Sequence, residues 1–436
     1  MAYQPQCTTP IRPKAFLVGC CAMDENISSV NEYLDELTEL AKTLDTDVCG
    51  RMTVRIREHN PKYFVGSGKA EEISIAADEA NADVIIFDDP LGPSQQRNLE
   101  KLCKRKVIDR QEIILDIFAA RAQTKEAVLQ VELARCCYFL PRLTGAWTHL
   151  SRQRGGNTGA RGEGEKQIEI DRRQLKKRIA ELELELAEIR KQRGIQRKER
   201  LRNTIPSVAI VGYTNAGKSS LINLLTDSDI LAENKLFATL DPTTRRMTLP
   251  DKSPVLLTDT VGFIRKLPHS LVEAFKSTLE EAILADFVIL LLDVSSAQAP
   301  EHWETTISVL NELGAADKTI IPVFNKTDLQ PDPFAILKMK SIAPDAVFIS
   351  CRTGNGIEQL KERLMLQVNT NAEITDIEIP PEQAKLTAFL HDKCCIFQSG
   401  YYDNGTFFAT VKIPFAYRDI FGPYSKKNQN GAFLKQ

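Results

Sequence analysis

The sequence predicts an α/β protein of several domains. We expect an N-terminal α/β domain, a long antiparallel helical hairpin, a P-loop domain whose mixed sheet carries helices on both faces, and a small α+β C-terminal domain. Strand-like and helix-like runs alternate in two regions, a heptad repeat lies between them, and a phosphate-binding motif follows an apolar strand in the second region. With 436 residues, the chain is long enough for two to four such domains.

Composition excludes several classes of protein. Hydrophobic residues make up 43% of the chain and charged residues 26%, which excludes intrinsic disorder and collagen. A net charge of −2 means that any nucleic-acid contact must come from a local basic patch. Ten cysteines without C-x-x-C or zinc spacing favour reduced thiols and a cytoplasmic protein. Apolar residues 15–23 after Arg12 and Lys14 resemble a signal peptide, but a first β-strand is the favoured alternative.

The predicted N-terminal domain, residues 1–110, alternates strand-like with helical runs. The strand-like runs are residues 16–19, 48–56, 84–87 and 107–109. The helical runs are residues 28–44, 69–80 and 94–103. This alternation predicts a small α/β domain with a largely parallel sheet.

Residues 111–202 are predicted to form a helical hairpin. Helical periodicity covers residues 111–140, and a glycine-rich basic stretch, residues 144–164, precedes a long second helix. The apolar positions of that helix follow a heptad spacing: Ile168, Leu175, Ile179, Leu182, Leu186 and Ile189. Two long helices joined by a loop should therefore pack as an antiparallel pair.

Charge distinguishes the hairpin from the rest of the chain. Residues 142–202 carry 17 Lys/Arg against 9 Asp/Glu, a net charge of +8 in a chain of net −2. The loop from Ser151 to Gly164 adds Arg152, Arg154 and Arg161 without an apolar anchor. We predict that it binds a polyanion. The alternatives are a solvated helix face or a structural coiled-coil spacer.

The third region, residues 203–369, contains a P-loop. The apolar run 208–211 leads into G-x-x-x-x-G-K-S, and a helix continues from Ser220. The motif consists of Gly212, Tyr213, Thr214, Asn215, Ala216, Gly217, Lys218 and Ser219. Backbone N–H groups of such a loop wrap phosphates, Lys218 would reach the β/γ-phosphates, and the Ser219 hydroxyl would bind Mg²⁺.

A second motif, D-x-x-G, ends the next apolar strand. It consists of Asp259, Thr260, Val261 and Gly262. Asp259 would hold Mg²⁺ through water, and the Gly262 N–H would contact the γ-phosphate. A switch threonine is expected between the two motifs, and the residues leave three candidates: Thr239, Thr243 and Thr244.

Two further motifs predict specificity for guanine. An apolar strand ends in N-K-x-D, formed by Asn325, Lys326, Thr327 and Asp328. Asp328 can accept hydrogen bonds from two N–H groups that guanine has and adenine lacks. Asn325 would support the loop, and the aliphatic stem of Lys326 would cover the ring of the base. The last strand ends at Ser350, Cys351 and Arg352, where a backbone N–H can meet guanine O6. Four motifs in this order predict GTP and Mg²⁺ as ligands.

The C-terminal domain, residues 370–436, carries no recognisable chemical motif. Pro380 and Pro381 are interpreted as a boundary, followed by a helix over residues 383–393. Asn404 and Gly405 between alternating apolar residues predict a β-hairpin.

From about residue 15 to the C-terminus, the sequence resembles the HflX-type GTPases, ribosome-associated translation-factor GTPases of the TRAFAC class. The matching motifs are residues 63–69, 107–110, 116–122, 129–134, 155–165 and 171–173. The F-A-T-L-D-P-T segment is also similar and implies nucleotide contacts by Phe237, Ala238, Thr239, Leu240 and Asp241. The resemblance selects Thr239 as the second Mg²⁺ ligand beside Ser219. We expect Lys218, Thr239 and Gly262 to act in catalysis.

The resemblance also implies a function. Such proteins hydrolyse GTP, bind the large ribosomal subunit with the hairpin loop near the peptidyl-transferase region, and split or rescue stalled ribosomes under stress. Phe263, where many GTPases have a water-positioning glutamine, predicts slow hydrolysis that the ribosome stimulates. We expect a monomer without membrane insertion. The alternatives are a large-subunit assembly factor and a nucleotide-gated binding module for a protein or membrane partner.

Overall fold

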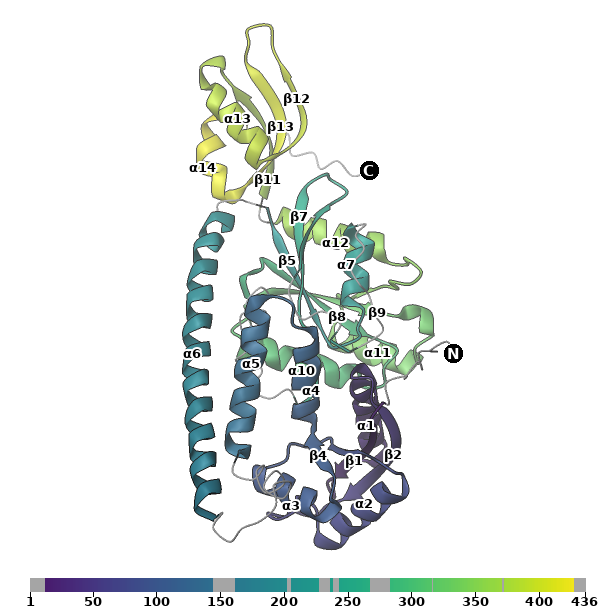
Figure 1. Cartoon of the computed structure of the whole chain (residues 1–436). Coiled ribbons are helices and arrows are strands. Elements are labelled where there is room, and N and C mark those ends of the chain that lie inside the picture. Colours follow the sequence, from purple (N-terminus) through teal and green to yellow (C-terminus); the bar gives the residue numbers. More distant parts are fainter. Residues whose placement is uncertain are drawn as a thin grey trace, which may run out of the picture. The chain divides into compact units, whose positions relative to one another are not determined.

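The computed structural model describes residues 12–143, 161–201, 205–226, 236–237, 243–266, 283–315, 317–370 and 372–426 (Figure 1). Contacts divide the chain into two compact units. The first comprises Met1–Arg190, Glu233–Asp241 and Ile264–Thr278, and the second comprises the remaining segments. The predicted divisions at residues 110, 202 and 369 differ from this partition and stay predictions. Among the described residues, no helix is long and apolar enough to cross a membrane.

The first unit contains a four-stranded parallel sheet in the order β2-β1-β3-β4, as predicted. Its strands are β1 (Lys14–Cys21), β2 (Asp47–Arg55), β3 (Val84–Phe87) and β4 (Lys106–Asp109). The helices that alternate with them are α1 (Ile27–Thr43), α2 (Ser67–Glu79) and α3 (Pro93–Cys103). Because β1 is a central strand with seven of its eight residues buried, the apolar run after Lys14 is the predicted strand.

The predicted helical run 111–140 is wrong in one respect, because the structure breaks it. Two helices, α4 (Arg110–Arg121) and α5 (Lys125–Phe139), are separated where Ala122 turns extended. The Thr124 hydroxyl accepts a hydrogen bond from the Ala127 N–H at 3.2 Å and caps α5. The helix-capping residue Thr124 is the sequence signal for this break, but the apolar periodicity continues across it and favours a single helix. A short 3₁₀ turn, η1 (Leu140–Arg142), follows α5.

The hairpin is antiparallel, as predicted. Helix α5 runs toward the loop, and α6 (Arg161–Leu201) returns beside it (Figure 1). Leu182 and Leu186 of the heptad seam are buried against Leu129 of α5. The Arg178 guanidinium donates to both oxygens of Glu132 at 2.7 and 2.9 Å. At 41 residues, α6 extends about 60 Å, and it begins before the predicted end of the loop at residue 164.

The second unit contains a six-stranded sheet in the order β10-β9-β8-β5-β7-β6. Its strands are β5 (Ser207–Gly212), β6 (Thr244–Thr248), β7 (Pro254–Asp259), β8 (Phe287–Asp293), β9 (Thr319–Asn325) and β10 (Val347–Phe348). Its helices are α7 (Lys218–Thr226), α10 (Ala299–Glu312), α11 (Pro333–Ile342) and α12 (Ile357–Asn369), with a 3₁₀ turn η3 (Thr327–Leu329). Only the β6–β7 pair is antiparallel, which gives the predicted mixed sheet. Ligands of such sheets bind at the carboxyl ends of the parallel strands, where all four motifs lie.

A small antiparallel sheet with the order β12-β13-β11-β14 forms the C-terminal part of the second unit. Its strands are β11 (Ala372–Ile379), β12 (Cys395–Tyr401), β13 (Phe407–Pro414) and β14 (Ser425–Lys426). Its helical segments are η4 (Pro381–Gln383), α13 (Ala384–Lys393), η5 (Phe415–Tyr417), α14 (Arg418–Phe421) and η6 (Gly422–Tyr424). The predicted hairpin is confirmed. The predicted boundary at Pro380 is wrong, because β11 precedes it and pairs with β13 along its whole length.

One ion pair joins the C-terminal sheet to the β6–β7 hairpin. The buried Lys412 ammonium of β13 lies 3.0 Å from an Asp251 carboxylate oxygen and 3.2 Å from the Ser253 hydroxyl. Burial would raise the pKa of Asp251, but hydrogen bonds from Ser253 and Lys412 lower it below its usual value. The C-terminal sheet is therefore held to the hairpin by a charged contact that water reaches poorly.

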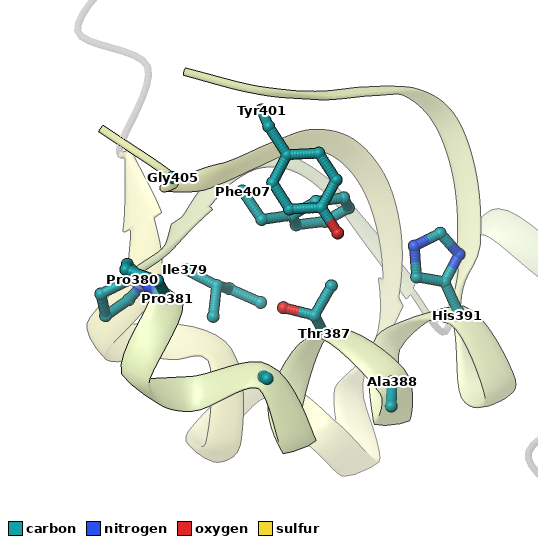
Figure 2. A pocket seen from close by; sticks show the side chains of 10 residues that line it. Ile379, Pro380, Pro381, Thr387, Ala388, His391, Tyr401, Gly405 and Phe407 are labelled. Carbon is teal, nitrogen blue, oxygen red and sulfur yellow. The ribbon is translucent and has the colours of Figure 1, made fainter. Parts of the chain in front are cut away.

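A cavity of about 380 Å³ opens in the C-terminal sheet beside α13. Figure 2 shows the rings of Tyr401 and Phe407 on one side and Thr387, Ala388 and His391 of α13 on the other. The remaining lining is apolar, and no Lys, Arg, Asp or Glu contributes to it. Because phosphates need cations or convergent N–H groups, this cavity is a poor candidate for a nucleotide site.

Candidate nucleotide-binding site

The P-loop joins the end of β5 to the start of α7, as the sequence predicted. Gly217 has a φ of +97°, and a Cβ there would collide with the Nδ2 of Asn325, so only glycine fits. That Asn325 amide donates to the Ala216 carbonyl at 2.8 Å. This hydrogen bond links the N-K-x-D motif to the P-loop. Inside the loop, the Tyr213 ring stacks on His302 of α10 with centroids 3.7 Å apart, a contact that no motif signals.

Lys218 is buried at the first position of α7. Its ammonium donates to the carbonyl oxygens of Gly212 at 3.2 Å and Tyr213 at 2.8 Å. Burial lowers the pKa of Lys218 to about 8, and the nearby Asp259 charge opposes this effect. Gly262 lies beside the ammonium, since a Cβ on Gly262 would be 2.9 Å from the Lys218 Nζ. Two predicted phosphate-binding residues are therefore brought together.

The lowered pKa of Lys218 predicts that GTP binding takes up a proton. Below about pH 8 the ammonium is charged and attracts phosphate, whereas above it the neutral amine must first be protonated. Affinity for GTP should therefore fall by up to about tenfold per pH unit above the pKa. Calorimetry at about pH 7 and 8.5, in two buffers of different ionisation heat, measures the uptake. A Lys218→Gln control should show none, and equal uptake in both proteins would contradict the assignment.

Ser219 and Asp259 form a pair suited to Mg²⁺. The Ser219 hydroxyl donates to an Asp259 carboxylate oxygen at 2.9 Å, and Asp259 is fully buried at the end of β7. Hydroxyl and carboxylate oxygens are the hard donors that Mg²⁺ prefers, so these residues fit the ion. When bound, Mg²⁺ would neutralise phosphate charge. The predicted ligand Thr239 lies outside the described residues, as do Ala238, Leu240 and Asp241.

Thr243 and Thr244, the two other candidates for the switch threonine, have different surroundings. The hydroxyl of Thr244 forms a hydrogen bond of 3.0 Å with that of Thr258 across the β6–β7 pair. Thr243 directly precedes β6, and its hydroxyl oxygen is buried. Thr244 is therefore engaged within the sheet, and its hydroxyl already has a protein partner.

The D-x-x-G segment starts at Asp259, the last residue of β7, and leads to Phe263, which forms an isolated parallel bridge with Tyr213. Thr260 is fully buried and donates to the Ile210 carbonyl at 2.7 Å, and Val261 is also buried. The Phe263 N–H then donates to the Gly212 carbonyl at 3.0 Å, while the Phe263 carbonyl accepts from the Thr214 N–H at 2.8 Å. Both backbone polar groups of Phe263 therefore pair with the P-loop. The role of Gly262 at the γ-phosphate stays a prediction.

The predicted guanine-binding residues form one hydrogen-bonded group. An Asp328 carboxylate oxygen accepts from the Ser350 hydroxyl at 2.7 Å, which orients it. The Cys351 N–H donates to the Asn325 side chain at 3.0 Å, and Lys326 pairs with Asp293 at 2.7 Å. The sequence suggested only a backbone contact near Ser350 and missed both its hydroxyl and Asp293. Thr327 donates to the Ile349 carbonyl, and Arg352 is exposed.

These motifs and their arrangement define a P-loop GTPase. Three family models match: "GTP-binding GTPase N-terminal" over residues 31–119, "GTP-binding GTPase Middle Region" over 121–200 and "50S ribosome-binding GTPase" over 207–326. The "GTPase HflX" of Akkermansia muciniphila is 48% identical over 93% of this chain and 95% of its own. The Escherichia coli "GTPase HflX" is 40% identical over 88% of this chain and 90% of its own. The chain belongs to the HflX family of ribosome-associated GTPases.

A solved structure is also similar. The GTP-binding protein of Sulfolobus solfataricus in complex with GDP is 26% identical, covers 82% of this chain and 99% of its own, and has a TM-score of 0.43. With the family established, the chain is a GTPase that binds and hydrolyses GTP.

Proposed function

We propose that this GTPase binds the large ribosomal subunit and couples GTP binding and hydrolysis to the splitting or rescue of stalled ribosomes in the cytoplasm. The observation that carries the proposal is the antiparallel pairing of α5 and α6, two helices that the sequence joins through a basic, glycine-rich segment. Rigid helices can place such a loop inside an RNA cavity that a globular surface could not enter. The "50S ribosome-binding GTPase" match over residues 207–326 supports the choice of partner.

The surface of α6 supports contact with RNA. Arg172, Arg173, Lys176 and Lys177 are exposed on its described part. The proposed contact loop, Ser151 to Gly164, lies outside the described residues apart from the start of α6. Its arginines would neutralise phosphates without reading base sequence. We propose that the protein acts as a monomer with Mg²⁺ held by Ser219 and Thr239.

Co-sedimentation with ribosomal particles tests the function. The protein is incubated with 70S ribosomes, mature large subunits and large-subunit precursors, each with GDP or a non-hydrolysable GTP analogue. We expect GTP-dependent binding to mature large subunits and conversion of 70S ribosomes into subunits. Binding to precursors alone would favour an assembly factor, and no binding in either nucleotide state would overturn the ribosomal role.

We predict that the loop arginines contribute mainly electrostatic affinity. Replacing Arg152, Arg154 and Arg161 by alanine should weaken binding to the large subunit and flatten its salt dependence, by roughly 0.7–0.9 log unit per lost phosphate contact for each log unit of salt. Affinity for GTP should not change. A matched control replaces Lys385, Arg418 and Arg363, three basic residues of the second unit. Unchanged ribosome affinity in the loop variant would mean that the hairpin is a spacer.

A further inference from the structure

The side chain of Tyr213, the second residue of the P-loop, packs against a residue outside the four nucleotide-binding motifs. Its ring stacks on the imidazole of His302 in α10, with centroids 3.7 Å apart and an angle of 15° between the ring planes. Tyr213 is only 5% exposed, and both residues belong to the second compact unit. Because two flat rings in such a stack lose contact when either one tilts, each ring holds the other in place.

The main chain of Tyr213 holds the lysine that we expect to act in catalysis. The Tyr213 carbonyl accepts hydrogen bonds from the Lys218 ammonium at 2.8 Å and from the Ala216 N–H at 3.3 Å. Tyr213 also forms an isolated parallel bridge with Phe263. The position of the Lys218 ammonium therefore depends on where the Tyr213 peptide group lies, and different partners fix the ring and the main chain of this tyrosine.

His302 is itself held firmly near the start of α10. Its N–H donates to the Gln298 carbonyl at 2.9 Å, and its own carbonyl accepts from the hydroxyl of the fully buried Thr306 at 2.7 Å. The next turn of the helix buries Val309 and Leu310. The imidazole thus projects from a helix that is anchored in the core, which makes it a rigid support for the Tyr213 ring.

The segment that leads from β8 into α10 contacts the nucleotide-binding motifs at two points. At its start, Asp293 pairs with Lys326 of the N-K-x-D motif at 2.7 Å and accepts from the Ser295 N–H at 3.0 Å. Further along the segment, His302 stacks on the P-loop tyrosine. This segment carries no nucleotide-binding motif, yet it contacts both the predicted base-binding group and the P-loop.

We propose that His302 is a positioning residue for GTP hydrolysis. Its ring holds the Tyr213 ring and so keeps the Tyr213 carbonyl where it orients the Lys218 ammonium. Without the stack, the backbone N–H groups of the P-loop still wrap the phosphates, but the ammonium is less well aligned with them. The loss should therefore affect the hydrolysis step more than the affinity for GDP.

The test measures single-turnover GTP hydrolysis at saturating protein, together with GDP affinity, in the full-length protein. His302→Ala should lower the rate by about 10–100-fold, the loss expected when a catalytic group is slightly misplaced. GDP affinity should change much less. His302→Phe keeps a flat ring and should restore most of the rate, whereas His302→Leu keeps apolar volume without a flat ring and should not.

The other ring of the stack gives an independent variant. Tyr213→Leu should lower the rate about as much as His302→Ala. The double variant should add little to either single change, because both remove the same contact. Additive losses would mean that the two rings act separately, which contradicts the proposal.

His391→Ala serves as the matched control. His391 also contacts an aromatic ring, that of Phe407, with centroids 5.5 Å apart, but it lines the cavity of the C-terminal sheet shown in Figure 2. Its hydrolysis rate should match that of the parent protein.

Three results would overturn the proposal. A lower melting temperature with an unchanged rate in His302→Ala would show that the stack only stabilises the fold. An equal fall in rate and GDP affinity would show that it supports the whole phosphate loop rather than the lysine. A rate in His302→Phe as low as in His302→Ala would show that stacking is not the function of the ring. If His302→Ala does not fold, His302→Leu decides, because it keeps the bulk of the side chain.

Discussion

A Lys218→Ala variant should lose GTP hydrolysis, both alone and with large ribosomal subunits, by about 10³-fold or more. The carbonyl oxygens of Gly212 and Tyr213 hold the buried ammonium, and we expect it to stabilise charge on the β/γ-phosphates. Single-turnover hydrolysis at saturating protein measures the loss. Lys326→Ala is the matched control, since Lys326 pairs with Asp293 in the predicted base-binding group. It should weaken GTP binding and leave the rate at saturation nearly unchanged.

The rate of GTP hydrolysis by the unmodified protein tests the expected effect of Phe263. Phe263 is 1% exposed, and its side chain cannot hydrogen-bond to the attacking water. We therefore expect slow hydrolysis by the protein alone and acceleration by large subunits. If the protein alone already reached the stimulated rate, the water-positioning group would lie within this chain. Residual activity of Lys218→Ala near the parent value would contradict the role of the ammonium.

Asp328→Asn should cost about 2–4 kcal/mol of GTP affinity and shift preference toward xanthine nucleotides. The carboxylate would accept from two N–H groups of guanine, whereas the amide of asparagine can donate to the C2 oxygen of xanthine. Ser350 already orients this side chain through its 2.7 Å hydrogen bond. Competition binding with GTP, XTP and ATP measures the shift.

Two controls separate base recognition from local structure. Ser350→Ala should weaken GTP binding by about 1 kcal/mol without a change in base preference, because only the orienting bond is lost. Asp332→Asn makes the same acid-to-amide change at the N-cap of α11, where asparagine caps equally well, and should be neutral. A parent-like preference for GTP in Asp328→Asn would remove Asp328 from the base-binding site.

The features that the sequence predicted correctly depend on local signals. A buried run such as β8 and a strand–loop–helix motif such as the P-loop are encoded within about ten residues. The heptad spacing likewise located the buried positions Leu182 and Leu186. Such features need no knowledge of distant partners, which is why a single sequence sufficed for them.

Contacts between distant residues were not predictable. Nothing near Asp88 indicates that Arg265 is its partner, because the pair forms only when β3 and the segment after D-x-x-G meet. The Ser350 hydroxyl on Asp328 has the same origin. The predicted domain boundary at Pro380 failed for another reason. Proline occurs wherever the chain changes direction, and here it marks the turn from β11 into η4 within one domain.

The contact between Lys412 and Asp251 bears on how the protein should be divided for experiments. A fragment covering residues 203–369 looks self-contained by its motifs, yet it deprives Asp251 of the Lys412 ammonium and Phe237 of the Phe118 ring. Each cut removes a partner of a side chain that the intact chain covers at least in part, so we expect such a fragment to show altered nucleotide binding even with every motif present. Shortened versions intended for crystallisation or kinetics should therefore retain both Phe118 of α4 and Lys412 of β13.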